Sequence, residues 1–142
     1  MLEWTKFCAL LAEAHFKAGQ IKEGLSALDE GFTVMEKTGE RFYQAELYRL
    51  KGELLLQSND YLSGAGVSRE VQEYFDKAWQ IASRQSAKSL ELRAAMSLSR
   101  LAKVQGRTEH VPCVLKETYN WFREGFDTPD LQEAKTLIAE TT

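Results

Sequence analysis

Cysteine, histidine and proline are scarce in this 142-residue chain, and their scarcity excludes several kinds of site. Cys8 and Cys113, the only cysteines, both lie in apolar helical patterns, so we expect two buried free thiols, as in a reducing cytoplasm. Neither His15 nor His110 has cysteines or carboxylates at metal-ligand spacing, and we expect His15 to pack or cap a helix. The sequence therefore predicts no metal, no cofactor and no catalytic residues.

Long apolar runs and a strong excess of one charge are also missing. No apolar stretch reaches the roughly 20 residues of a membrane-spanning helix, and the start has no signal-peptide pattern. The net charge of -3 does not favour nucleic acid or an anionic membrane as a partner. We expect a single cytoplasmic domain that binds neither.

The chain has instead a degenerate helical repeat. Small residues recur at corresponding helix positions, namely Ala12, Gly52 and Ser99, and large apolar residues flank them. Small residues let the two helices of a hairpin approach closely, and large ones fill the space between hairpins. This pattern predicts an all-α, tetratricopeptide-like solenoid over residues 1–142, with about seven helices. We place three antiparallel hairpins at about 2–38, 40–86 and 87–124, and a short capping helix at about 129–140.

Two segments break the regular pattern. The loop Ser58–Ser68 is longer than the repeat requires, and we assign it no role. Near the end, Thr108 is the expected N-cap of the sixth helix, and Thr128-Pro129 opens the seventh. The aromatic residues between these helices are expected to pin the last helix rather than to form a ligand platform; they are Trp121, Phe122 and Phe126.

The first helix of each hairpin lines the concave groove of a tetratricopeptide array. Counting outward from the three small residues places long, mostly polar side chains there, which are Lys6, Glu13, Lys17, Arg49, Glu53, Gln57, Arg93, Met96, Arg100 and Lys103. Such a groove suits an extended or helical partner segment, and the alternative is a groove filled only by water. We expect Arg49, Arg93 and Arg100 to be exposed, so that reversing their charge leaves folding intact.

Basic residues cluster in the last third of the chain, at Arg84, Lys88, Arg93, Arg100, Lys103 and Arg107. We interpret the cluster as a solvated helix face, with an acidic peptide ligand as the alternative.

The first helix is apolar nearly all the way round, although an end helix of a repeat array should present a polar outer face. We expect self-association, as a homodimer, through residues of this helix that include Leu2, Trp4, Phe7, Leu10 and Leu11. The other explanation is that the helix packs against a preceding repeat.

Three stretches resemble one protein family. They are Glu46–Leu55, Ala87–Leu101 and Tyr119–Leu131 with Glu133–Lys135. They are similar to the C-terminal end of large bacterial signalling ATPases, in which a nucleotide cyclase or transcriptional-regulator domain precedes an AAA-type module and a tetratricopeptide-like array. The resemblance covers the chain from about Arg41 onward. The chain has no phosphate-binding loop and no cyclase metal site.

The resemblance therefore implies a non-catalytic interaction or regulatory module, the sensor or coupling end of such a protein. Its partner would be a protein or peptide segment, including adjoining ATPase or cyclase domains. The alternative function is a stand-alone adaptor that acts as a structural or self-assembling repeat domain.

Overall fold

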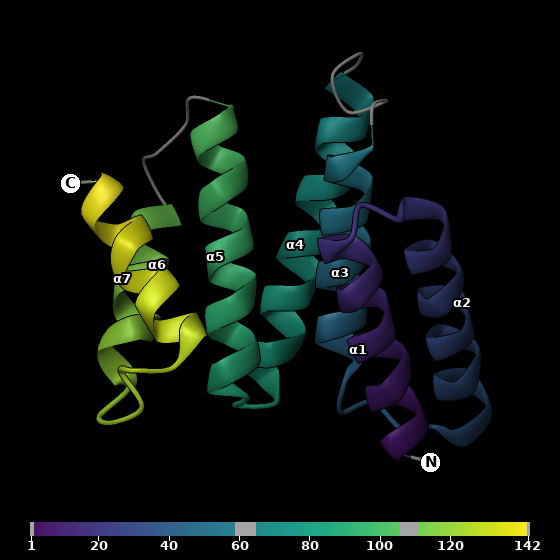
Figure 1. The fold of residues 1–142 in the computed structure, drawn as a ribbon. Coiled ribbons are helices and arrows are strands. Elements are labelled where there is room, and N and C mark those ends of the chain that lie inside the picture. The colour runs from purple at the N-terminus through teal and green to yellow at the C-terminus, as the bar shows by residue number, and fades with distance from the viewer. Residues whose placement is uncertain (1, 59–64, 106–110, 142) are drawn as a thin grey trace.

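The computed structural model describes residues 2–58, 65–105 and 111–141, and the regular structure in these ranges is entirely α-helical (Figure 1). Seven helices follow one another, as predicted: α1 (Leu2–Lys17), α2 (Ile21–Thr38), α3 (Gln44–Gln57), α4 (Ala65–Arg84), α5 (Lys88–Val104), α6 (Val111–Trp121) and α7 (Pro129–Thr141). The predictions made for Arg107, Thr108 and His110, and for most of the loop Ser58–Ser68, lie outside the described residues.

Short connections with special backbone conformations join several of the helices. Gly39 ends α2 in the left-handed region, at φ 76°, and its N–H donates to the carbonyl oxygen of Met35. Gly19 has a φ of 73° in the turn between α1 and α2. Glycine adopts this conformation without the steric cost that a Cβ would bring. These two turns reverse the direction of the chain between α1 and α2 and between α2 and α3 (Figure 1).

The helices form two layers. Each helix packs against the next along the chain, and in addition α1 packs against α3, α3 against α5, and α5 against α7 (Figure 1). In the described part of the chain, the even-numbered helices make no such contacts with one another. The odd-numbered helices therefore lie side by side, and residues at corresponding positions of α1, α3, α5 and α7 share one surface.

Apolar side chains fill the space between the layers in three adjoining clusters. The first joins α1, α2 and α3 around Leu28, Leu47 and Leu50, and the second joins α3, α4 and α5 around Phe75 and Leu101. The third joins α5, α6 and α7, where α7 contributes residues that include Leu131, Ala134 and Leu137. The small residues of the repeat are buried as expected, and the ring of Phe75 lies directly over Gly52.

Several expectations about burial near the C-terminal end are wrong. Cys113 is exposed, because α6 turns Leu115 and Thr118 inward instead. Trp121 and Phe126 are 56% and 45% exposed, so they do not form the predicted core contact with the last helix. The helix α6 ends at Trp121, and α7 is covered by apolar residues of α5 and α6 together with the half-buried Phe122.

Two expectations near the N-terminal end agree with the structure. Cys8 is buried as a free thiol, and burial, with Glu30 nearby, raises its pKa. The half-buried ring of His15 hydrogen-bonds through Nδ1 to Oε1 of Gln20, at 2.7 Å, and so packs over the turn that follows α1.

Candidate functional site

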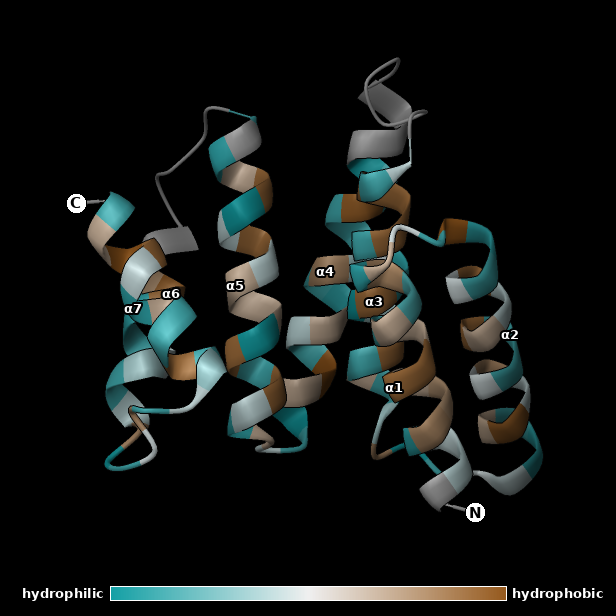
Figure 2. Cartoon of the chain, in the orientation of Figure 1, coloured by the Kyte–Doolittle hydropathy of each residue, from teal (hydrophilic) through white to brown (hydrophobic). Residues whose placement is uncertain are grey.

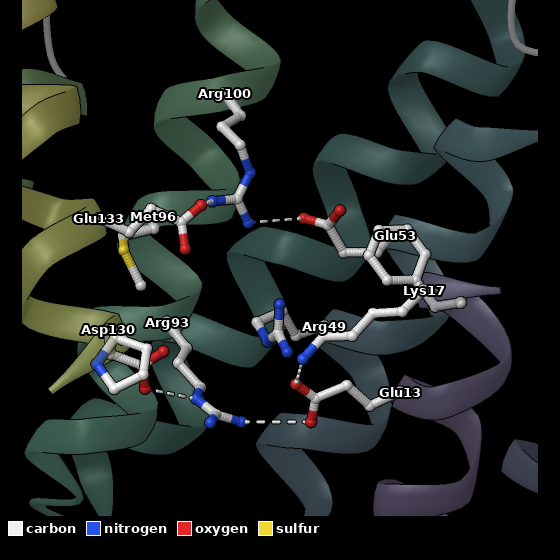
Figure 3. Close-up of a pocket in the computed structure, with 11 residues that line it drawn as sticks. Glu13, Lys17, Arg49, Glu53, Arg93, Met96, Arg100, Asp130 and Glu133 are labelled. Atoms are coloured by element: carbon white, nitrogen blue, oxygen red, sulfur yellow. Dashed lines mark hydrogen bonds and ion pairs between the residues drawn. The ribbon is translucent and has the colours of Figure 1, made fainter. Parts of the chain in front are cut away.

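A hollow opens on the surface formed by the odd-numbered helices. It has a volume of about 360 Å³ and is lined by Glu13, Phe16, Lys17, Arg49, Glu53, Arg93, Met96, Arg100, Pro129, Asp130 and Glu133. These residues come from α1, α3, α5 and α7, which all present the same face here (Figure 3). The packing of the odd-numbered helices thus brings together charged side chains that are far apart in the sequence.

Arg49, which lines the hollow, forms a buried ion pair with Glu46 within α3. Glu46 and Arg49 are 4% and 7% exposed, and they lie three residues apart on one face of the helix. Arg49 donates from Nε and Nη2 to the two carboxylate oxygens of Glu46, at 3.0 and 2.7 Å. This bidentate geometry fixes both side chains. Arg49 also reaches Ser97 of α5 through Nη1, at 3.4 Å.

Arg93 of α5 connects all the helices around the lower part of the hollow. Its Nη1 donates to Glu46 of α3 at 2.8 Å, and its Nε donates to Asp130 of α7 at 2.8 Å. Glu13 of α1 lies 3.7 Å from the same Nη1 (Figure 3). One guanidinium group therefore couples the positions of four helices.

Arg100 repeats this arrangement two turns further along α5. It donates from Nη2 to Glu53 of α3, at 3.2 Å, and from Nη1 to Glu133 of α7, at 2.6 Å (Figure 3). The side chains of Arg93 and Arg100 are about one third exposed, whereas the side chain of Arg49 is buried. Their charges are thus held in place while remaining open to the hollow.

The network is ionised at neutral pH. Burial by itself opposes ionisation of Glu46, but Arg49 and Arg93 outweigh this effect and lower the pKa of Glu46 to about 2. Burial likewise disfavours charge on Arg49, and Glu46 and Glu53 overcome it and raise the pKa of Arg49. Glu46, Asp130 and their hydrogen bonds similarly raise the pKa of Arg93 against its partial burial. The hollow therefore presents fixed charges of both signs.

Most of the predicted groove residues line the hollow, namely Glu13, Lys17, Arg49, Glu53, Arg93, Met96 and Arg100. Lys6 lies in an adjoining hollow beside Leu10 and Glu13. Gln57 donates from Nε2 to the carbonyl oxygen of Phe16, and Lys103 pairs with Glu140 outside the hollow.

The expectation that the three groove arginines are exposed is wrong for Arg49, which is buried, whereas Arg93 and Arg100 are about one third exposed. Arg49 is buried against Glu46, and Arg93 contacts the same carboxylate. Reversal at these positions would leave buried carboxylates facing new negative charges, which is strongly destabilising. The predicted basic cluster does not form one solvated face. Arg93 and Arg100 lie in the ion network of the hollow, whereas Arg84 and Lys103 are exposed.

The predicted groove omits Asp130 and Glu133, which line the hollow, and Glu46, which holds Arg49 and Arg93 in place. A signal for Glu46 was present, because it occupies the repeat position that Lys6 and Arg93 also occupy when Ala12, Gly52 and Ser99 are aligned. Asp130 and Glu133 have no such signal, because the sequence predicts the last helix to be a cap outside the repeat.

The described residues include no group of three or more His, Cys, Asp or Glu side chains placed to hold a metal ion. No helix in the described ranges is both long and apolar enough to cross a membrane. No protein-family model matches the chain, and no curated protein or solved structure is significantly similar to it.

Proposed function

We propose that the chain is a non-catalytic interaction module that binds a segment of another protein in the hollow between α1, α3, α5 and α7. The observation that carries this proposal is the convergence of ordered, partly exposed charges from four helices on one open surface. Charged groups fixed in this way confer specificity, because a wrong partner meets like charge or leaves a charge unpaired.

The proposed architecture is a tetratricopeptide-like solenoid in which the hollow is part of the concave groove. Its support is the two-layer packing, in which the odd-numbered helices contact one another while each even-numbered helix contacts its neighbours along the chain. In such arrays the stacked hairpins create an extended binding surface. The residues of that surface are then fixed by the stacking rather than by a flexible loop.

The preferred ligand is an extended or helical peptide segment that carries acidic residues. Arg93 and Arg100 lie two helical turns apart on α5, and their present partners Asp130 and Glu133 are themselves partly exposed. An incoming carboxylate can therefore take the place of a side-chain carboxylate at modest cost, since exposed ion pairs are weak. Phe16 and Met96 supply apolar contacts in the same hollow.

The proposed biological setting is the sensor or coupling end of a cytoplasmic bacterial signalling ATPase or cyclase. The stretches that carry this resemblance, Glu46–Leu55, Ala87–Leu101 and Tyr119–Leu131 with Glu133–Lys135, also supply most of the groove residues. The segment bound in the groove would then belong to an adjoining ATPase or cyclase domain, or to the protein that reports the signal.

A displayed library of random peptides, selected on the intact chain, tests the binding function. Lys17→Glu and Arg100→Gln alter the hollow at side chains that are 72% and 31% exposed, so both variants should remain folded. We expect the selected peptides to be rich in acidic residues and to bind each variant several-fold more weakly. Lys22→Glu is the matched control, because Lys22 is exposed on α2, away from the hollow. The proposal would be contradicted if Lys22→Glu weakened peptide binding as much as the two hollow variants do. It would also be contradicted if neither Lys17→Glu nor Arg100→Gln weakened binding.

A further inference from the structure

The outer face of α1 is an exposed apolar stripe. Trp4, Phe7, Leu10 and Leu11 are 42%, 52%, 55% and 36% exposed, and the rings of Trp4 and Phe7 stack at 5.5 Å. Apolar residues extend over most of the length of this helix (Figure 2). Contiguous exposed apolar surface of this kind marks an interaction site.

Aligning the repeats shows which residues of α3 and α5 are equivalent to the residues of this stripe. When Ala12, Gly52 and Ser99 are aligned, Phe7, Leu10 and Ala14 match Leu47, Leu50 and Leu54 of α3. All three leucines are fully buried, and Leu47 and Leu54 contact α2 at Gly31 and Gly24. The corresponding residues of α5, which are Ala94, Ser97 and Leu101, are buried as well. The exposed stripe of α1 is therefore the face with which later odd-numbered helices pack onto the preceding hairpin.

A second copy has no open hairpin groove to offer this face. In the described structure, α3 packs on the first hairpin, α5 packs on α3 and α4, and α7 packs on α5 and α6. The outer face of α7, at the opposite end of the array, is polar, because residues such as Gln132, Lys135 and Thr136 are exposed on it. The aromatic residues exposed near this end, Trp121 and Phe126, belong to α6 and to the loop before α7. A head-to-tail contact would thus place apolar side chains on a polar surface. The surface of a second copy that does match is its own α1 stripe.

We propose that two copies of the chain associate through α1, with the two helices antiparallel about a two-fold axis. An axis level with Ala9 places Trp4 beside Ala14 of the second copy, and Phe7 beside Leu11 of the second copy. Ala14 is exposed and small, so it leaves room for the indole ring. This isologous arrangement closes on itself and covers both stripes at once.

Charges at the edge of the stripe favour the same antiparallel register. Lys6 and Glu13 lie on one edge of α1, since both line the hollow that also contains Leu10. The two-fold axis keeps this edge on the same side of both copies and brings Lys6 of one copy close to Glu13 of the other. Two equivalent attractions of opposite charges result. In a parallel two-fold arrangement this edge would lie on opposite sides of the contact in the two copies, so Lys6 of one copy would not meet Glu13 of the other.

The contact is small, so the dimer should be weak. A 16-residue helix is about 24 Å long, and a standard interface buries about 800 Å² on each partner. One helix face supplies only part of that area. We therefore expect a concentration-dependent equilibrium between monomer and dimer at micromolar concentration.

Sedimentation equilibrium of the intact chain, from low to high micromolar concentration, tests the proposal. Wild-type chain should shift from monomer to dimer, and Phe7→Glu should remain monomeric with an unchanged circular dichroism spectrum. Trp121→Glu is the matched control, because Trp121 is similarly exposed but lies on α6. It should dimerise as the wild type does. A monomeric wild type, or dimerisation that Trp121→Glu abolishes and Phe7→Glu does not, would overturn the proposal.

The charge pairs provide a test that non-specific apolar association cannot pass. Lys6→Glu should weaken the dimer about tenfold, because it replaces both attractions with repulsions. Glu13→Gln should weaken the dimer slightly in the wild-type background but strengthen it in the Lys6→Glu background, where it removes the repulsion. Effects of Glu13→Gln with the same sign in both backgrounds would exclude the antiparallel register.

Discussion

Glu46 is the residue on which the charge network depends, because it accepts hydrogen bonds from two arginines in a buried position. Its pKa falls from an ordinary value of 4.5 to about 2 on folding. A carboxyl group with a lowered folded-state pKa adds stability above its unfolded-state pKa and loses it as the pH falls. The relevant window therefore runs from about pH 4.5 down to pH 2, and the contribution amounts to about 3 kcal/mol.

Replacing Glu46 by Gln should consequently destabilise the chain in a pH-dependent way. At neutral pH we expect a loss of about 3–5 kcal/mol, because Arg49 stays buried without its carboxylate partner. The difference from wild type should shrink as the pH falls below 4.5. Urea unfolding followed by circular dichroism at a series of pH values measures both effects. The exposed Glu36→Gln serves as control, and a Glu46→Gln deficit that is equal at neutral and acid pH would contradict the assignment.

Two buried serines on α5 offer a second comparison at the residue scale. Ser97 accepts hydrogen bonds from Arg49 and Arg100, whereas the hydroxyl of Ser99 is buried and has no partner in the described structure. An unpartnered buried hydroxyl costs free energy, and alanine is the better helix former. Ser99→Ala should therefore raise the free energy of unfolding by about 0.5–1 kcal/mol. Ser97→Ala should lower it, and thermal unfolding that ranks the two variants in the opposite order would refute this explanation.

The sequence predicted which surface the groove side chains face better than it predicted how deeply they are buried. Counting from the small residues correctly placed Arg49 and Arg93 toward the surface shared by α1, α3, α5 and α7. It did not reveal that Arg49 is buried, because burial depends on how far α5 approaches α3 and on Glu46 as a partner. Periodicity fixes an angle around a helix axis, and it does not fix the distance to the neighbouring helix.

Small residues on the helices determine how closely two neighbouring helices can pack. A Cβ added at Gly52 would lie 2.5 Å from Cε1 of Phe75, which is closer than such atoms can approach. At Gly24 the closest atoms to an added Cβ would be the flexible ends of Leu54, at 2.8 and 2.9 Å, with Cβ of His15 in ordinary contact at 3.4 Å. At Gly52, therefore, the ring of Phe75 on α4 leaves no room for a side chain on α3.

Gly52→Ala should destabilise the chain by about 1–3 kcal/mol, although alanine favours helix formation. Phe75→Leu should remove most of this cost, so a double-mutant cycle between the two positions should show strong coupling. Gly24→Ala is the comparison, with a smaller expected loss because Leu54 can change rotamer. Additive effects of Gly52→Ala and Phe75→Leu in chemical denaturation would mean that the ring does not limit the approach.

The helices themselves were predictable because apolar residues recur with a helical period along each of them. The end of α6 was not, since the aromatic residues from Trp121 to Phe126 continue an apolar pattern past the last helical residue. Their exposure reflects the packing of α7, whose buried face is satisfied by Leu92, Met96 and Leu115. Local pattern alone does not tell which of several apolar segments a neighbouring helix will cover.

The two ends of the whole molecule differ in a way that follows from the repeat. The α7 end presents polar side chains, and the α1 end presents Trp4, Phe7 and Leu10. If the apolar α1 end of one copy entered an open groove at the other end of a second copy, copies would add head to tail without limit. A polar surface at that other end prevents this assembly. In the described structure α7 packs on α5 and α6, and so covers the apolar surface that the α1 stripe of another copy would need.

Removing α7, by ending the chain after Thr128, should change the mode of association. The deletion uncovers Leu92, Met96 and Leu115, which α7 now covers, and so creates an open groove at one end of the array. The α1 stripe of another copy can enter this groove, and each added copy leaves a new groove open. We therefore expect species larger than a dimer, whose size in light scattering increases with concentration, provided that circular dichroism shows the remaining helices intact.

Adding Phe7→Glu to the shortened chain should suppress this growth, because it removes the inserting face and leaves the open groove unchanged. A shortened chain that remains a dimer, or that grows equally well with Phe7→Glu, would show that the α1 stripe and the α7 face are not interchangeable.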